Sequence, residues 1–222
     1  MNNALKFAGL DYRTVKPYLT IKNGLIFIMV ALILIFSTGE STVALTMLMV
    51  YGNIFVSYPF AVGEKNGIDA LYAVLSVNRK TVVIGRYLFT IIVDILTAVS
   101  AFFISLVISI AMSKTGSIRE TITIITAIFL IFTFIQTIQL SLFFKLGYDK
   151  AKLLAYVPLA GLPVVIILFS KLFSGDGKRL HIIIEWSILH PGIIIALIVI
   201  IWGAAALISF ALSLKYYRNR DF

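Results

Sequence analysis

The chain has 222 residues, of which 60% are apolar and only 13% are charged, and its net charge is +9. A soluble domain is about 45–50% apolar and ~25% charged, so this composition excludes a globular domain that folds in water. The chain has no cysteine, which excludes disulfides, thiolate nucleophiles and cysteine-based metal sites. His181 and His190 stand apart from any cluster of metal ligands, so no metal or cofactor is expected on this chain.

The first expected element is a helix over residues 1–16. Its apolar positions repeat at helical spacing, and Lys6 and Arg13 point away from them. These positions are Leu5, Ala8, Tyr12, Val15 and Leu19. The pattern predicts an amphipathic helix that lies in the membrane interface, with an ordinary juxtamembrane anchor as the alternative.

The rest of the chain is dominated by long apolar segments. A helix that crosses the hydrocarbon core needs about 20 mostly apolar residues, and six segments meet this requirement. They are residues 17–37, 41–62, 86–112, 121–144, 151–172 and 192–214. The first is the weakest, because Lys22 lies inside it. We therefore expect an all-α polytopic membrane protein with six transmembrane helices and one domain over residues 1–222.

An even number of spans places both termini on the same side of the membrane. Fourteen of the nineteen Lys and Arg residues fall on that side, in the two terminal segments, residues 63–86 and residues 145–152. The positive-inside rule assigns this side to the cytoplasm. The basic excess is thus interpreted as orientation and contact with membrane lipids, not as nucleic-acid binding.

Three polar residues lie at a similar predicted depth inside the spans: Asp94 in the third, and Gln136 and Gln139 in the fourth. An ionisable residue inside a membrane is a functional hypothesis by default. Asp94 could bond the glutamines as structural glue, line a polar path, or titrate. We favour structural glue.

The loop between the second and third spans carries an apolar stripe at helical spacing, Ile68, Leu71, Tyr72 and Leu75. A short cytosolic helix with such a stripe is typical of an element that enters a groove on a partner. The alternative is a helix that lies on the membrane surface.

The same loop carries the only specific sequence likeness. Residues 58–72 read YPFAVGEKNGIDALY, followed by LSVNRK at 75–80 and GRY at 85–87. This segment resembles the small six-span permeases of type-2 ATP-binding cassette (ABC) exporters, particularly the branch that includes staphylococcal phenol-soluble modulin exporters. The resemblance implies that the loop holds a short coupling helix that docks on an ATPase subunit.

The resemblance also implies partners and a membrane. It assigns partner contacts to six residues of the coupling helix region: Glu64, Lys65, Asp69, Leu71, Tyr72 and Leu75. It implies separate ATPase subunits that carry the ATP and Mg, a second permease subunit in a homo- or heterodimer, amphipathic peptides as cargo, and a bacterial cell membrane.

The sequence contains no G-x-x-x-x-G-K-[ST] phosphate loop, so the chain is not expected to be an enzyme. We therefore expect the permease subunit of an ATP-driven exporter. Two alternatives remain open: a stand-alone channel or secondary transporter, and an intramembrane enzyme. The second is disfavoured, because Asp94 has no second acid or metal-binding histidine beside it in the spans.

Overall fold

A computed structural model describes residues 2–18, 20–38, 42–74, 77–111, 118–174 and 191–220. Within these ranges the chain forms helices and short connections, and no strand. The helices are α1 (Asn2–Val15), η1 (Lys16–Tyr18), α2 (Ile21–Thr38), α3 (Thr42–Lys65), α4 (Ile68–Val74), α5 (Arg79–Ala111), α6 (Ile118–Leu146), α7 (Tyr148–Ser174) and α9 (Pro191–Arg218). The predicted all-α class is confirmed for the described part of the chain.

Four of these helices are long and apolar enough to cross a membrane, namely α3, α5, α6 and α9. The pair α1 and α2, bent by 77° relative to each other, would count as a fifth span if the two form one broken segment. The described residues therefore support four or five spans, where the sequence predicted six. Helices α2 and α7 coincide with the first and fifth predicted spans, but neither is among the four helices that meet the length and apolarity criteria on their own.

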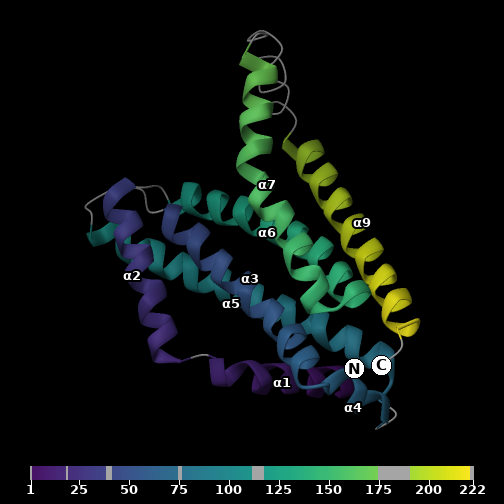
Figure 1. Cartoon of the computed structure of the whole chain (residues 1–222). Coiled ribbons are helices and arrows are strands. Elements are labelled where there is room, and N and C mark those ends of the chain that lie inside the picture. Colours follow the sequence, from purple (N-terminus) through teal and green to yellow (C-terminus); the bar gives the residue numbers. More distant parts are fainter. Residues whose placement is uncertain are drawn as a thin grey trace.

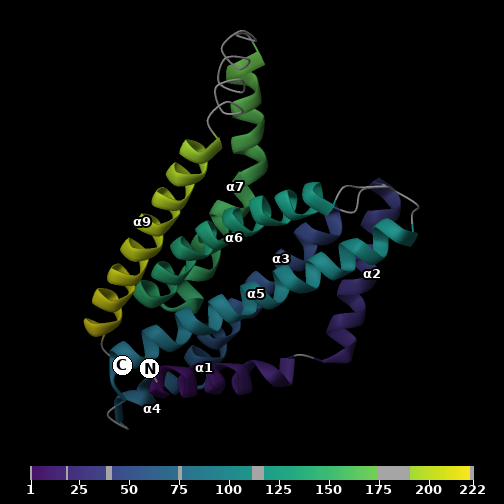
Figure 2. The same cartoon turned by 180° about the vertical axis from the view of Figure 1, so that it is seen from behind.

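The helices diverge from one crowded end (Figures 1 and 2). Helices α3 and α5 pack along each other, α1 lies across them, and α6 packs against both α7 and α9. Both chain ends and α4 lie together at the crowded end, while α7 and α9 extend away from it (Figure 1). The two ends of the described chain therefore lie at one end of the molecule.

The main core lies at this crowded end, where side chains from α1, α3, α5, α6, α7 and α9 meet. Its fully buried members are Phe7, Val56, Phe60, Val82, Val83, Leu140, Phe143, Phe144, Ala151, Ala155 and Tyr217. Away from the core, large apolar side chains such as Ile110 and Leu207 are exposed. Such exposure is costly in water and favourable in lipid, so the bundle is built for a membrane.

Helix α1 forms where the sequence predicted it, but its buried face is rotated from the expected one. Ala4, Phe7, Ala8, Asp11 and Val15 face the bundle, whereas Leu5 and Tyr12 are about half exposed. The rotation follows from a close approach to α5. A side-chain carbon at Gly85 would come within 2.6 Å of the Phe7 ring, so only glycine lets α1 pack this closely.

Candidate functional site

The loop that resembles a coupling segment folds as a short helix held against the bundle. Helix α3 continues through Pro59 to Lys65, beyond the predicted end of the second span at residue 62. The chain then turns at Gly67, whose φ of 62° lies in the left-handed region that glycine adopts without strain. Helix α4 begins directly after this turn, so the turn determines how α4 leaves α3.

A buried ion pair joins α4 to α5. Nη2 of Arg86 lies 3.1 Å from Oδ1 of Asp69, and both side chains are buried. The Arg86 guanidinium also stacks over the Phe60 ring of α3, 4.3 Å from its centroid. The Tyr217 hydroxyl of α9 donates to the same Asp69 oxygen at 3.3 Å. One carboxylate on α4 is therefore tied to two long helices.

Asp11 of α1 belongs to the same environment. It is buried, and Oδ2 of its carboxylate has no hydrogen-bond partner among the described residues. Burial raises the pKa of Asp11 to about 7, partly offset by the positive charge of Arg86 and reinforced by the negative charge of Asp69. Asp11, Asp69, Arg86 and Tyr217 are called the ionic cluster below.

The predicted apolar stripe of α4 is divided between two environments. Tyr72 is half-buried and packs edge-on against Phe7 of α1, with ring centroids 5.1 Å apart. Leu71 and Val74 are exposed, at 52% and 80%. Leu75 lies outside the described residues. Tyr72 therefore holds α4 to the bundle, and Leu71 and Val74 form its free apolar surface.

Glu64, at the end of α3, contacts the beginning of α7. Its carboxylate accepts hydrogen bonds from the backbone N–H groups of Tyr148 and Asp149. Gly147 has a φ of 80°, and a side-chain carbon there would lie 2.7 Å from Oε2 of Glu64. Glu64 is thus the N-terminal cap of α7, where a negative charge also suits the helix dipole. Lys65 beside it is exposed.

Arg79, at the start of α5, binds the end of α9. One of its nitrogens, Nη1, donates to the backbone carbonyls of Tyr217, Arg218 and Arg220 at 2.6–3.0 Å. No sequence pattern assigned a role to Asp11, Arg79, Arg86 or Tyr217. Arg86 carried a usable signal, because a cation inside a long apolar helix needs a buried partner.

The intramembrane polar residues are only partly brought together. Nε2 of Gln136 donates to Oδ1 of Asp94 at 2.9 Å, joining α6 to α5. Gln139 is also buried, but its Nε2 finds no partner within the described ranges. Asp94 and Gln136 line a cavity of about 190 Å³ that also touches Trp202 of α9. The predicted bonding of Asp94 therefore holds for Gln136.

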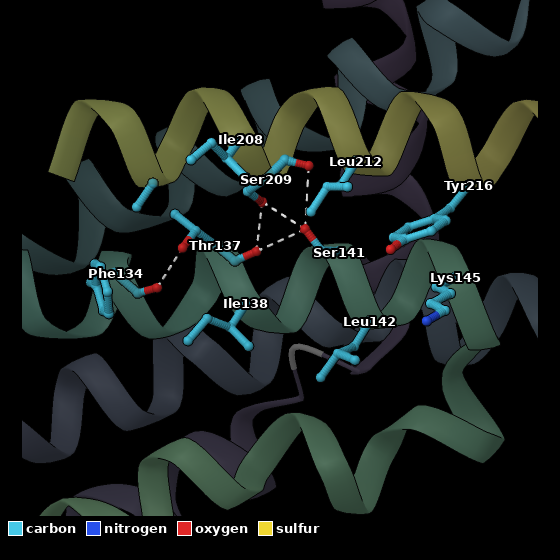
Figure 3. A pocket seen from close by; sticks show the side chains of 11 residues that line it. Phe134, Thr137, Ile138, Ser141, Leu142, Lys145, Ile208, Ser209, Leu212 and Tyr216 are labelled. Carbon is cyan, nitrogen blue, oxygen red and sulfur yellow. Dashed lines mark hydrogen bonds between the residues drawn. The ribbon is translucent and has the colours of Figure 1, made fainter. Parts of the chain in front are cut away.

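A second hollow lies between α6 and α9 and has a volume of about 410 Å³. Thr137, Ser141 and Ser209 face one another across its floor (Figure 3). Ser141 Oγ lies 3.0 Å from Ser209 Oγ, which in turn donates to the Thr137 carbonyl. Lys145 and Tyr216 lie at one end of the hollow. In the described part of the chain, no three His, Asp or Glu side chains gather as a metal site would require.

Comparison with known proteins identifies the family. The family model of the ABC-2 family transporter protein matches residues 11–218, which is nearly the whole chain. The chain belongs to the ABC-2 transporter family. No curated protein and no solved structure matches it.

An ABC-2 membrane protein is the permease subunit of an ABC transporter, and it works with ATP-binding cassette ATPase subunits. The permease is the transport subunit of the complex and is not itself catalytic. Membership therefore disfavours the stand-alone channel, the secondary transporter and the intramembrane enzyme. It also agrees with a multi-pass membrane protein, as the apolar helices indicate.

Proposed function

We propose that this ABC-2 permease is part of an exporter that moves amphipathic peptides out of a bacterial cell. The support for peptide cargo and for the outward direction is the likeness of residues 58–87 to phenol-soluble modulin exporters. The excess of Lys and Arg at the crowded end supports a cytoplasmic location of both termini. In the proposed complex, two permease subunits surround the path and two ATPase subunits bind below them.

The observation that carries the coupling role is the way α4 is held. On its inner side, Asp69 pairs with Arg86 of α5, and Tyr72 packs on Phe7 of α1. On its outer side, Leu71 and Val74 are exposed. A partner that binds the outer surface and moves would therefore displace α5 and α1 directly. A rigid connection of this kind is what a coupling helix requires.

The residues predicted for partner contact then have different roles in the proposal. Leu71 enters a groove on the ATPase, with Leu75 near it along the chain, and exposed Lys65 contributes a charge at the rim. Asp69 and Tyr72 hold α4 in place. Glu64, at the end of α3 next to α4, transmits the motion of α4 to α7 through the cap. Rim charges generally affect orientation and association rate more than affinity.

The test replaces the exposed pair in a Leu71→Ala, Val74→Ala double variant. Truncation of a central contact can cost ~2 kcal/mol or more per residue, so ATPase co-purification and stimulated hydrolysis should fall at least tenfold. Insertion should be unaffected, because neither side chain packs in the core. The control is Leu10→Ala, which trims a similarly exposed leucine on α1 at 46% exposure. Full ATPase association of the double variant would remove α4 from the coupling role.

A second test addresses direction and cargo. In inside-out vesicles that contain the permease and its ATPase, a labelled amphipathic helical peptide should accumulate only when ATP is present. A peptide of the same composition with a scrambled, non-amphipathic order is the control. Equal uptake of both peptides would contradict the cargo class, and uptake only into right-side-out vesicles would reverse the direction.

Orientation can be measured separately, because the chain has no cysteine of its own. In intact cells, an impermeant thiol reagent should label Lys178→Cys and leave Ser76→Cys unlabelled. The opposite labelling pattern would place the crowded end outside and exclude its contact with a cytoplasmic ATPase.

A further inference from the structure

The groove between α6 and α9 has an ordered polarity along its length. Its walls are apolar side chains from both helices, and its polar end is formed by Lys145 and Tyr216. The wall residues are Phe134, Ile138, Leu142, Ala205, Ile208 and Leu212. Lys145 is in the last turn of α6 and Tyr216 is near the end of α9, so the polar end lies where both helices leave the membrane. Figure 3 shows Phe134 at the opposite end.

The floor of the groove offers few free polar groups. Ser209 Oγ donates to the Thr137 carbonyl, and Ser141 Oγ lies within hydrogen-bonding distance of both Ser209 Oγ and the Ser209 carbonyl. The Tyr87 hydroxyl of α5 lies 2.6 Å from Ser209 Oγ. These bonds hold α6 against α9, so the groove is preformed and presents mainly apolar surface to an occupant.

Lys145 is the free charge of the groove. Its side chain is exposed, and its ammonium lies 5.2 Å from the centroid of the Tyr216 ring. Among the described residues no carboxylate forms an ion pair with it, whereas Lys152 on α7 pairs with Asp149. Lys145 can therefore bind an anion, and Figure 3 shows Tyr216 at the same end of the groove.

The length of the groove matches one leaflet. Phe134 and Lys145 are eleven residues apart on α6, which corresponds to about 16 Å along a helix. Half of a hydrocarbon core of ~30 Å is ~15 Å. The groove thus runs from the interface to about the middle of the membrane. A small soluble anion would leave most of this apolar length empty. An uncharged hydrocarbon ligand would leave Lys145 without a counter-charge.

We propose that this groove binds an anionic phospholipid of the leaflet at the crowded end. One acyl chain lies along the apolar walls, and the headgroup phosphate contacts Lys145 and Tyr216. Basic pockets between transmembrane helices commonly bind anionic headgroups, and the volume of about 410 Å³ is in the range of small-molecule sites. The proposal goes beyond the transport function and does not depend on the identity of the cargo.

The test is lipid titration of the purified full chain, followed by native mass spectrometry. The probes are dioleoyl phosphatidylglycerol and dioleoyl phosphatidylcholine, which differ in headgroup charge and share the same acyl chains. Lys145→Gln removes the cation, and its control Lys150→Gln removes another exposed cation at the same end. Ala205→Trp fills the apolar part, and its control Ala211→Trp adds the same bulk to an exposed position outside the groove.

The unaltered chain should bind phosphatidylglycerol more tightly than phosphatidylcholine. Lys145→Gln should weaken phosphatidylglycerol binding about fivefold, equivalent to ~1 kcal/mol for one cation at a membrane surface, with phosphatidylcholine unchanged. Ala205→Trp should weaken both lipids, and the two controls should stay within about twofold of the unaltered chain.

Three outcomes would overturn the proposal. Equal losses in Lys145→Gln and Lys150→Gln would indicate diffuse surface charge. Unchanged lipid affinity in a folded Ala205→Trp variant would exclude the acyl site. Loss of a homodimer in that variant, with lipid binding intact, would assign the groove to a second copy of this chain. If circular dichroism shows that Ala205→Trp does not fold, the proposal is decided by comparing phosphatidylglycerol binding of Lys145→Gln and Lys150→Gln.

Discussion

Two buried polar clusters in this permease differ in charge and in the number of elements they join. The ionic cluster brings Asp11, Asp69, Arg86 and Tyr217 together from α1, α4, α5 and α9. The second cluster is the carboxyl–amide pair, Asp94 and Gln136, which joins only α5 and α6. The first is at the crowded end of the bundle, and the second is inside the spans.

The comparison shows what each kind of polar contact is suited to do. A buried ion pair is stable only while both partners and their extra hydrogen bonds are present, so its members must move together. A single amide–carboxyl bond in a membrane contributes little and can exchange partners. The ionic cluster is thus suited to transmitting movement between α4 and the spans as a rigid unit. The carboxyl–amide pair is suited to the adjustable packing of two helices.

The largest effect is expected from Arg86→Met, which leaves Asp69 and Asp11 buried without their cation. Breaking one side of a buried ion pair typically costs about 3–5 kcal/mol. The free energy of unfolding in detergent micelles should fall accordingly. The control is Lys80→Met, an exposed cation on the same helix. A second substitution, Asp69→Leu, should restore part of the loss. Equal stability of the Arg86→Met and Lys80→Met variants would remove the distinction between the two clusters.

A pH dependence is expected from Asp11. Its pKa in the folded chain is about 7, above the ordinary value of 3.8, so the folded state binds the proton more tightly. The stabilisation is fully present below about pH 4 and is lost as the pH rises through 7. Melting temperatures between pH 5 and 8 should therefore fall with rising pH. The slope should shrink in Asp11→Asn, and an identical slope in that variant would contradict the burial of this acid.

A smaller effect is expected from Glu64→Ala, which removes the N-terminal cap of α7. Loss of a cap costs ~1 kcal/mol. Glu64→Gln keeps an acceptor and should lose less, and Lys65→Ala, its exposed neighbour, should have almost no effect on unfolding. A loss in Lys65→Ala as large as that in Glu64→Ala would indicate a general charge effect at this end.

The smallest effect is expected at the carboxyl–amide pair. Asp94→Asn keeps a hydrogen bond to Gln136, and Asp94→Leu removes it, with an expected loss of ~0.6 kcal/mol. Transport and folding should survive in Asp94→Asn. If a well-folded Asp94→Asn protein has lost all transport, Asp94 acts by titration, and the pair is more than a packing contact.

Much of the local structure was predictable from the sequence, because it depends on neighbours along the chain. Apolar segments of sufficient length predicted the spanning helices α3, α5, α6 and α9. The stripe around Leu71 predicted a short helix, and Gly67 supplies the turn that precedes it. Similar predicted depths of Asp94 and Gln136 indicated their bond.

The faces and partners that these elements use depend on packing between distant parts of the chain. Asp69 meets Arg86 and Tyr217, and Glu64 meets Tyr148, across separations of 17, 148 and 84 residues that no local pattern reports. In a membrane, apolar side chains that face lipid and those that face protein look alike in sequence. The spacing of apolar residues therefore predicted that α1 is a helix, and the packing of Phe7 against Gly85 decided which side of it is buried.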